Sequence, residues 1–197
     1  MPRVVVMFAH LVMASVMVCG CQPVGSRSPG EVVITPPAAW CRVAASTWLA
    51  PGKPLAAWAG PEGASLVLYE SLPAPGATAK SVASALANRL DNLKGFQVIK
   101  SQVLDLAVGE AARVDLVAPG TGDALAPSGS GTPYTPPGRT LVPTRQVTVA
   151  FVRPDGVYFL AWHAPDAVFA RIEPDLQATL TTVQLAADGQ PSRYTQD

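Results

Sequence analysis

Two cysteines separated by one residue, Cys19 and Cys21, are the most reactive side chains near the start of the chain. Thiolates bind metals and exchange disulfides, so the pair raises both possibilities. Zinc sites usually space their cysteines by about two to four residues and add further cysteine or histidine ligands. Cys19-Gly20-Cys21 has neither that spacing nor partner histidines. A thiol can also accept a covalent group, and the residues before the pair favour that third use.

Those preceding residues form a signal-like segment. Arg3 supplies a positive charge, and the 15 residues from Val4 to Val18 are apolar except for His10 and Ser15. The run is shorter than the roughly 20 residues that span a bilayer. It fits the apolar region of a secretory signal, which is about 7–15 residues long. A retained membrane anchor is the alternative interpretation.

The run ends in Val18-Cys19-Gly20-Cys21, which resembles the lipobox of bacterial lipoproteins. In that motif a small residue precedes a cysteine that receives a diacylglycerol thioether. The resemblance implies a signal peptide of residues 1–20, cleavage between Gly20 and Cys21, and lipid on Cys21. Cys19 fits the acceptor position poorly because the bulky Val18 would stand before it.

The residue after the lipid acceptor bears on location. In enteric bacteria an aspartate there signals retention in the inner membrane, whereas this chain has Gln22. Acyl chains contribute about 0.8 kcal/mol per buried CH₂, and a stable hold takes more than one chain. We therefore predict a cell-envelope protein, anchored through its N-terminal lipid, with the outer membrane and a periplasm-facing domain favoured.

Catalytic side chains are few beyond this segment. His163 is the only histidine there, and with Asp166 and a serine it could form a hydrolase site. No G-x-S-x-G motif accompanies it, so we interpret His163 as a strand end and Asp166 as a helix cap. Cys41 is either a reactive thiol or a small buried hydrophobe, and we favour the second interpretation. We predict no catalytic, cofactor-binding or metal-binding residue.

Four tryptophans offer a different chemistry, because aromatic rings can line a cleft for a sugar or another small ligand. In a chain with only 14% charged residues, large aromatic side chains more often belong to the core. A small-ligand carrier with an aromatic-lined cleft therefore stays as the alternative function. The four residues are Trp40, Trp48, Trp58 and Trp162.

The overall composition limits the partners. The chain has 197 residues, is 49% hydrophobic and has a formal net charge of zero. Without a broad basic surface it is not expected to bind nucleic acid. Its length suits one substantial domain.

Hydrophobic periodicity predicts an α+β domain. Thr78 is a candidate helix N-cap and Gly95 a candidate C′ residue, with Val82, Leu86, Leu90 and Leu93 on one face between them. A second helix is expected from Asp166 to about Gln184, with Phe169, Ile172, Leu176, Leu180 and Val183 on one face and Pro174 kinking or restarting it.

Strands are expected over 40–46, 55–59, 64–70, 96–106, 111–117, 147–151 and 157–163. Strands joined by hairpins favour an antiparallel sheet with helices packed on it.

Proline and glycine divide the chain further. We expect a flexible tether over 21–38, a domain over 39–185 and a loose tail over 186–197. Within the domain, 10 of the 25 residues over 118–142 are proline or glycine. We expect a disordered insertion there, and the alternative is a partner-binding loop that uses Tyr134 and Arg139.

The segments "TAKSVASALANRLDNLKG", "FQVIKSQVLDLAVGEAARVDL" and "VTVAFVRPDGVYFLAWHAPDAVFARIEPDLQATLTTV" together resemble the PsbP-like (Mog1p/PsbP-like) family, in the form of DcrB- and LpqN-type lipoproteins. The resemblance covers roughly residues 40–185. It implies a central antiparallel sheet between helices, an α/β/α sandwich without catalytic machinery. Members act as accessory or binding modules, so the predicted function is a lipid-anchored module that serves another envelope protein.

Overall fold

The computed structural model describes residues 25–26, 31–44, 52–72, 74–119, 142–186 and 191–192. Most of these residues belong to one sheet and the two helices packed on it. The sheet strands are β3 (Cys41–Val43), β4 (Lys53–Ala59), β5 (Ser65–Ser71), β6 (Gln97–Leu106), β7 (Gly109–Ala118), β8 (Thr144–Val152) and β9 (Val157–Pro165). The helices are α1 (Ala79–Asp91) and α2 (Asp166–Thr181), and a short 3-10 turn, η2 (Pro61–Gly63), joins β4 to β5.

The seven strands run in the order β3-β4-β5-β9-β8-β7-β6, and every neighbouring pair is antiparallel. Two hairpins, β6–β7 and β8–β9, form one half of the sheet. The other half comes from β3, β4 and β5, and it joins the first half where β5 pairs with β9. The predicted order of strands, helix, two hairpins and helix is therefore confirmed in the described residues.

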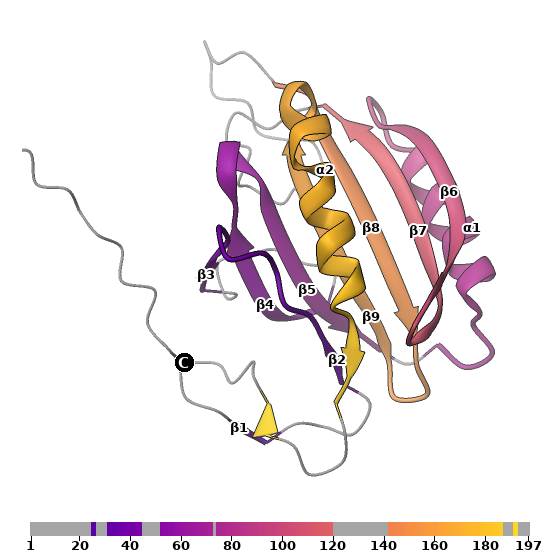
Figure 1. Cartoon of the computed structure of the whole chain (residues 1–197). Helices are drawn as coiled ribbons and strands as arrows, with labels where there is room; N and C mark the ends of the chain where they lie inside the picture. Colours follow the sequence, from indigo (N-terminus) through magenta and orange to yellow (C-terminus); the bar gives the residue numbers. More distant parts are fainter. Residues whose placement is uncertain are drawn as a thin grey trace, which may run out of the picture.

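The two helices lie on opposite faces of the sheet (Figure 1). α2 crosses β8 and β9 on the near face, and α1 lies behind β6 and β7, with further contacts to β8. Because successive side chains of a strand point to opposite faces, each strand contributes side chains to both helices. On β7, Ala112 and Val114 point toward α1. Arg113 and Asp115, on the same strand, point toward α2. This α/β/α arrangement confirms the predicted fold class.

A capping box starts α1 where the sequence predicted. The Thr78 hydroxyl accepts from the Ser81 N–H at 3.1 Å, and the Ser81 hydroxyl accepts from the Thr78 N–H at 2.9 Å. The helix ends at Asp91, before the predicted Gly95, because the chain turns at Asn92. Leu93 therefore lies outside the helix and is 44% exposed, which corrects its place on the predicted apolar face.

The apolar face of α2 is confirmed: Phe169, Ile172, Leu176 and Leu180 are all buried against the sheet. The helix does not restart at Pro174, which sits inside one continuous element. Packing on both sides of the proline holds the helix together, although the ring removes one backbone donor.

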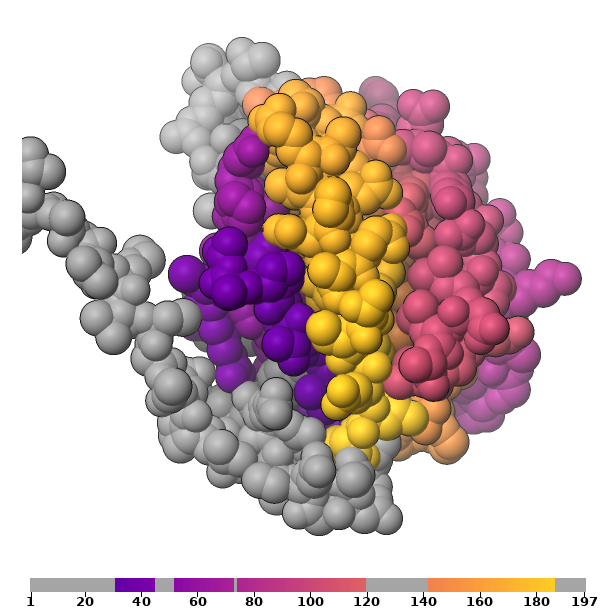
Figure 2. Space-filling view, viewed as in Figure 1, coloured from indigo at the N-terminus to yellow at the C-terminus, as the bar shows by residue number. Residues whose placement is uncertain are grey.

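The tether prediction is wrong for residues 31–38, because residues 31–40 pack along the domain. We call residues 31–40 the N-terminal strap. Val32, Val33 and Ile34 are at most 5% exposed. β2 (Val32–Val33) pairs with β10 (Gln184–Leu185) just after α2, and Figure 2 shows the strap alongside α2. Prolines and glycines around this short apolar run obscured it in the sequence.

Trp40 fixes the end of the strap. Its ring centroid lies 4.4 Å from that of Trp162, and its Nε1–H donates to Oδ2 of Asp175 on α2 at 2.9 Å. The ring passes so close to Gly60 that a Cβ there would lie 2.5 Å from it. Any larger residue at position 60 would displace the indole, so this glycine is required by close approach.

A second pairing joins a segment that precedes the strap to a segment that follows β10. β1 (Gly25–Ser26) pairs with β11 (Pro191–Ser192), and Ala186 donates its backbone N–H to the carbonyl of Glu31 at 2.8 Å. The predicted signal peptide, Cys21 and residues 120–141 of the predicted insertion lie outside the described residues.

The strap makes a direct stability prediction. Ile34→Ala should lower the free energy of unfolding by about 2–5 kcal/mol, because Ile34 is 3% exposed within the core. Urea unfolding followed by tryptophan fluorescence measures the change. Val142→Ala, at a side chain that is 46% exposed, is the matched control and should change little. Equal effects of the two substitutions would contradict the packing of the strap and support a flexible tether over residues 31–34.

Candidate functional site

The structure separates the side chains that a hydrolase would need to bring together. His163 on β9 is opposite Ser65 on β5 and Gln146 on β8, all on the sheet face that carries α1. Asp166 turns to the other face, where its Oδ1 accepts from Nε of Arg145 at 2.9 Å. The possible hydrolase dyad of His163 and Asp166, which the sequence does not favour, is therefore not assembled.

Asp166 also differs from its predicted role as a helix cap. The N-cap of α2 is Pro165, which offers no side-chain cap, and Asp166 is the first helical residue. Its carboxylate still suits the positive end of the helix dipole. Arg145 holds that carboxylate while its guanidinium carbon lies 5.2 Å from the ring centroid of Phe169. The pair is a structural clamp at the start of α2.

The surroundings of His163 make it a poor general base. Burial lowers its pKa to about 4, so the imidazole is neutral at pH 7 and holds a proton weakly. On the neighbouring strand β5, the hydroxyl of Ser65 opposite His163 is buried without a hydrogen-bond partner in the described part of the chain. These two side chains form a short polar row with Gln146, whose Nε2 donates to the Thr148 hydroxyl at 3.0 Å.

The described tryptophans are core residues and line no cleft. Trp40, Trp58 and Trp162 are 5%, 7% and 0% exposed, and all belong to the cluster between the sheet and α2. The core interpretation of these three is therefore confirmed, whereas Trp48 lies outside the described residues. Cys41, on the edge strand β3, is a half-buried free thiol.

The most concentrated charges lie under the side of α2. Arg113 and Asp115, two residues apart on β7, form a two-pronged ion pair with both N–O distances at 2.7 Å. Their side chains are 6% and 10% exposed, and Glu173 on α2 approaches the same guanidinium at 3.6 Å. The hydrogen bonds that the Arg113 guanidinium donates to Asp115 raise the pKa of Arg113 further above its usual range. Because its charge is already balanced by two carboxylates, this arginine is not available to an anionic ligand.

A second ion pair lies at the surface and joins η2 to α2. Arg171 donates through Nε to Oε1 of Glu62 at 3.2 Å and contacts the other carboxylate oxygen as well. The hydrogen bond from Arg171 lowers the pKa of the Glu62 carboxyl. Glu62 has a φ of 54°, so the turn places its side chain at the cost of an uncommon backbone conformation.

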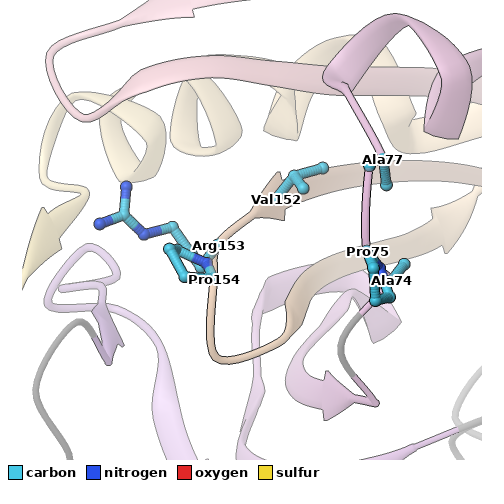
Figure 3. A pocket seen from close by; sticks show the side chains of 7 residues that line it. Ala74, Pro75, Ala77, Val152, Arg153 and Pro154 are labelled. Carbon is cyan, nitrogen blue, oxygen red and sulfur yellow. The ribbon is translucent and has the colours of Figure 1, made fainter.

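One hollow of about 390 Å³ opens at the end of the sheet where the strap begins. It is lined by residues 74–77, between β5 and α1, and by residues 152–154, at the β8–β9 turn. Figure 3 shows the Arg153 guanidinium extending away from Ala74, Pro75 and Ala77. The hollow therefore offers small apolar groups and no converging polar side chains, which ligand sites normally combine.

No group of three or more histidine, cysteine, aspartate or glutamate side chains is placed to hold a metal ion in the described part of the chain. Neither α1 nor α2 has the length and hydropathy to cross a membrane.

No family model matches the chain, and no curated protein sequence matches it. Solved structures do resemble it. Cyanobacterial PsbP (CyanoP) from Synechocystis has a TM-score of 0.50 at 9% identity, over 87% of this chain and 99% of that one. LpqN of Mycobacterium tuberculosis, described as involved in cell envelope biogenesis, has a TM-score of 0.46 at 15% identity, over 84% and 90% of the two chains. PA94 from Pseudomonas aeruginosa, of unknown function, has a TM-score of 0.43 at 17% identity, over 79% and 83%.

The likeness to CyanoP, together with the antiparallel sheet between two helices, shows that the fold is PsbP-like. At 9% identity the likeness concerns the fold alone. The predicted fold resemblance is thus confirmed, while the lipid site at Cys21 and the cleavage between Gly20 and Cys21 stay predictions.

The buried ion pair makes a stability prediction. Asp115→Ala should lower the free energy of unfolding by about 3–5 kcal/mol, because it leaves the Arg113 guanidinium buried with only Glu173 nearby. Glu62→Ala, which removes the surface pair with Arg171, is the matched control and should change little. Urea denaturation of both variants measures the difference. Similar midpoints for the two variants would show that the buried pair is not structural.

His163 makes a pH prediction. Its pKa of about 4 lies below the 6.5 of an exposed histidine, so the unfolded chain binds the proton more readily. The free energy of unfolding should therefore fall as the pH drops from about 6.5 to 4. His163→Gln should remove this part of the pH dependence while keeping a polar side chain, as urea titrations at several pH values would show. Parallel pH profiles of the wild type and the variant would contradict the assignment.

Proposed function

We propose that this protein is a non-catalytic, lipid-anchored envelope protein whose PsbP-like domain binds another envelope protein. The observation that carries the proposal is the sequence Val18-Cys19-Gly20-Cys21 after a signal-like apolar run. Cleavage after Gly20 would remove Cys19 and leave Cys21 as a lipidated N-terminus. Gln22 at the next position favours attachment to an outer membrane.

The point where the chain enters the domain supports this arrangement. The strap begins at Glu31, ten residues after Cys21. An extended chain spans at most about 3.3–3.6 Å per residue, so the domain would stay within about 35 Å of the lipid. The hollow and the β8–β9 turn lie at the same end of the sheet as the start of the strap. This end would therefore be the one nearest to the membrane.

The contacts of the reactive side chains favour binding over catalysis. Asp166 is held by Arg145, and Arg113 is held by Asp115 and Glu173. His163 is neutral and weakly basic, and it has no carboxylate partner in the described part of the chain. The three described tryptophans are in the core, so they provide no support for a small-ligand carrier.

Metabolic labelling tests the anchor. Cells that express the full chain are given labelled palmitate, and the wild type is compared with Cys21→Ala and Cys19→Ala. We expect the label on the wild type and on Cys19→Ala, with loss of at least 90% of it from Cys21→Ala. The Cys19 variant is the matched control because it changes the neighbouring thiol. Label that persists on Cys21→Ala would contradict the assignment.

The binding role is tested on the same membranes. The wild type and a chain lacking residues 120–141 are purified from solubilised membranes, and the copurifying envelope proteins are compared. A stoichiometric partner that copurifies with the wild type supports the module; its loss from the chain lacking residues 120–141 would assign the contact to that segment, and its retention would assign the contact to the rest of the domain. Recovery of the chain without any stoichiometric envelope protein would contradict the binding role while leaving the anchor intact.

A further inference from the structure

The two edges of the sheet differ greatly in length. β3 closes one edge with three residues, whereas β6 forms the other with ten. In the described part of the chain no strand pairs with the outer side of β6, and Figure 1 shows it at the margin of the sheet. An edge strand of this length presents a row of backbone donors and acceptors that another strand can use.

Apolar side chains gather at the same edge. Five large apolar side chains are exposed in the described residues, and three of them lie on β6 or just before it. Leu93, Ile99 and Val103 are 44%, 47% and 39% exposed. Val103 is opposite Ala112, and the hydroxyl of Ser101 lies 3.4 Å from the carbonyl of Ala83 on α1, so Val103 is on the α1 side of the edge. Grouped apolar side chains beside an open edge are typical of an interaction surface.

The geometry of β6 limits how a partner strand could add. The register with β7 shifts between Val98 and Lys100, so Ile99 forms a bulge. From Lys100 to Leu106 the pairing is regular, and Val103 is the midpoint of this stretch. An added strand would therefore pair best with these seven residues.

We propose that two copies of this protein pair through β6 in antiparallel fashion, with Val103 on the two-fold axis. Such an axis is perpendicular to the sheet, so each side chain stays on its own face, as strand pairing requires. Lys100 would be opposite Leu106 of the partner copy, and Ser101 opposite Asp105.

This register suits a second copy in its charges and its packing. Neither charged residue of the stretch meets a like charge, and the two Val103 side chains cover each other. α1 contacts both β6 and β7. With strands about 4.8 Å apart, the two α1 helices would lie roughly 10 Å apart across the axis, which is a normal helix packing distance. The result is one continuous sheet through both copies, and it does not depend on the lipid anchor.

Cross-linking at the axis tests the proposal. In the full chain with Cys41→Ser, Val103→Cys should give a disulfide-linked dimer in whole cells treated with a mild oxidant, because residue 103 meets its own copy. Leu72→Cys, at a side chain that is 84% exposed elsewhere, is the matched control and should stay largely uncross-linked. We expect at least a five-fold difference between the two.

A charge at the same position gives an independent readout. In detergent solution, light scattering should give the mass of two chains for the wild type and of one chain for Val103→Lys, which places two like charges face to face. Leu72→Lys should keep the mass of two chains, and circular dichroism checks that both variants are folded. A monomeric wild type would overturn the proposal. So would equal cross-linking at positions 72 and 103, or cross-linking of position 103 to a different polypeptide.

Discussion

The burial of Trp162 is the constraint on which the rest of this domain depends. Its side chain is fully buried at the middle of β9, and three separate parts of the chain close over it. α2 covers it from one side, the ring of Trp40 in the strap packs against it at a tilt, and Gly60 leaves room for the Trp40 ring. The hydrogen bond from Trp40 to Asp175 then joins the strap to α2.

The two faces of the sheet are built by different means. Toward α1 the packing relies on small residues such as Ala83, Ala112 and Ala150, which let the helix approach closely. Toward α2 the face carries large aromatic and branched side chains, and the charges of Arg113 and Asp115 are buried beside them. A buried ion pair is stable only when its hydrogen-bond geometry is good, because the loss of hydration offsets most of the attraction between the charges. Arg113, which could otherwise bind an anionic ligand, instead contacts Glu173 and helps to position α2.

The sequence predicted both helices and the order of elements along the chain, because hydrophobic periodicity and caps are local signals. It placed the end of α1 too late, since Gly95 resembles a C′ residue although the chain turns at Asn92. It missed the strap because the apolar run from Val32 to Ile34 is short and flanked by prolines, and its value lies in contacts with α2 and β10. The separation of His163 from Asp166 was also out of reach, because it depends on which sheet face each side chain takes.

The backbone hydrogen bond between Ala186 and Glu31 brings the first and last parts of the domain together. The chain therefore enters and leaves the domain at neighbouring points, and this hydrogen bond closes the loop formed by residues 31–186. Mechanical load on the N-terminal segment would reach the β1–β11 pair first and then the β2–β10 pair and the strap, and the seven-stranded sheet would carry it only after these contacts open. The domain can thus be pulled, or joined end to end by a short linker, without strain on the strands that form its core.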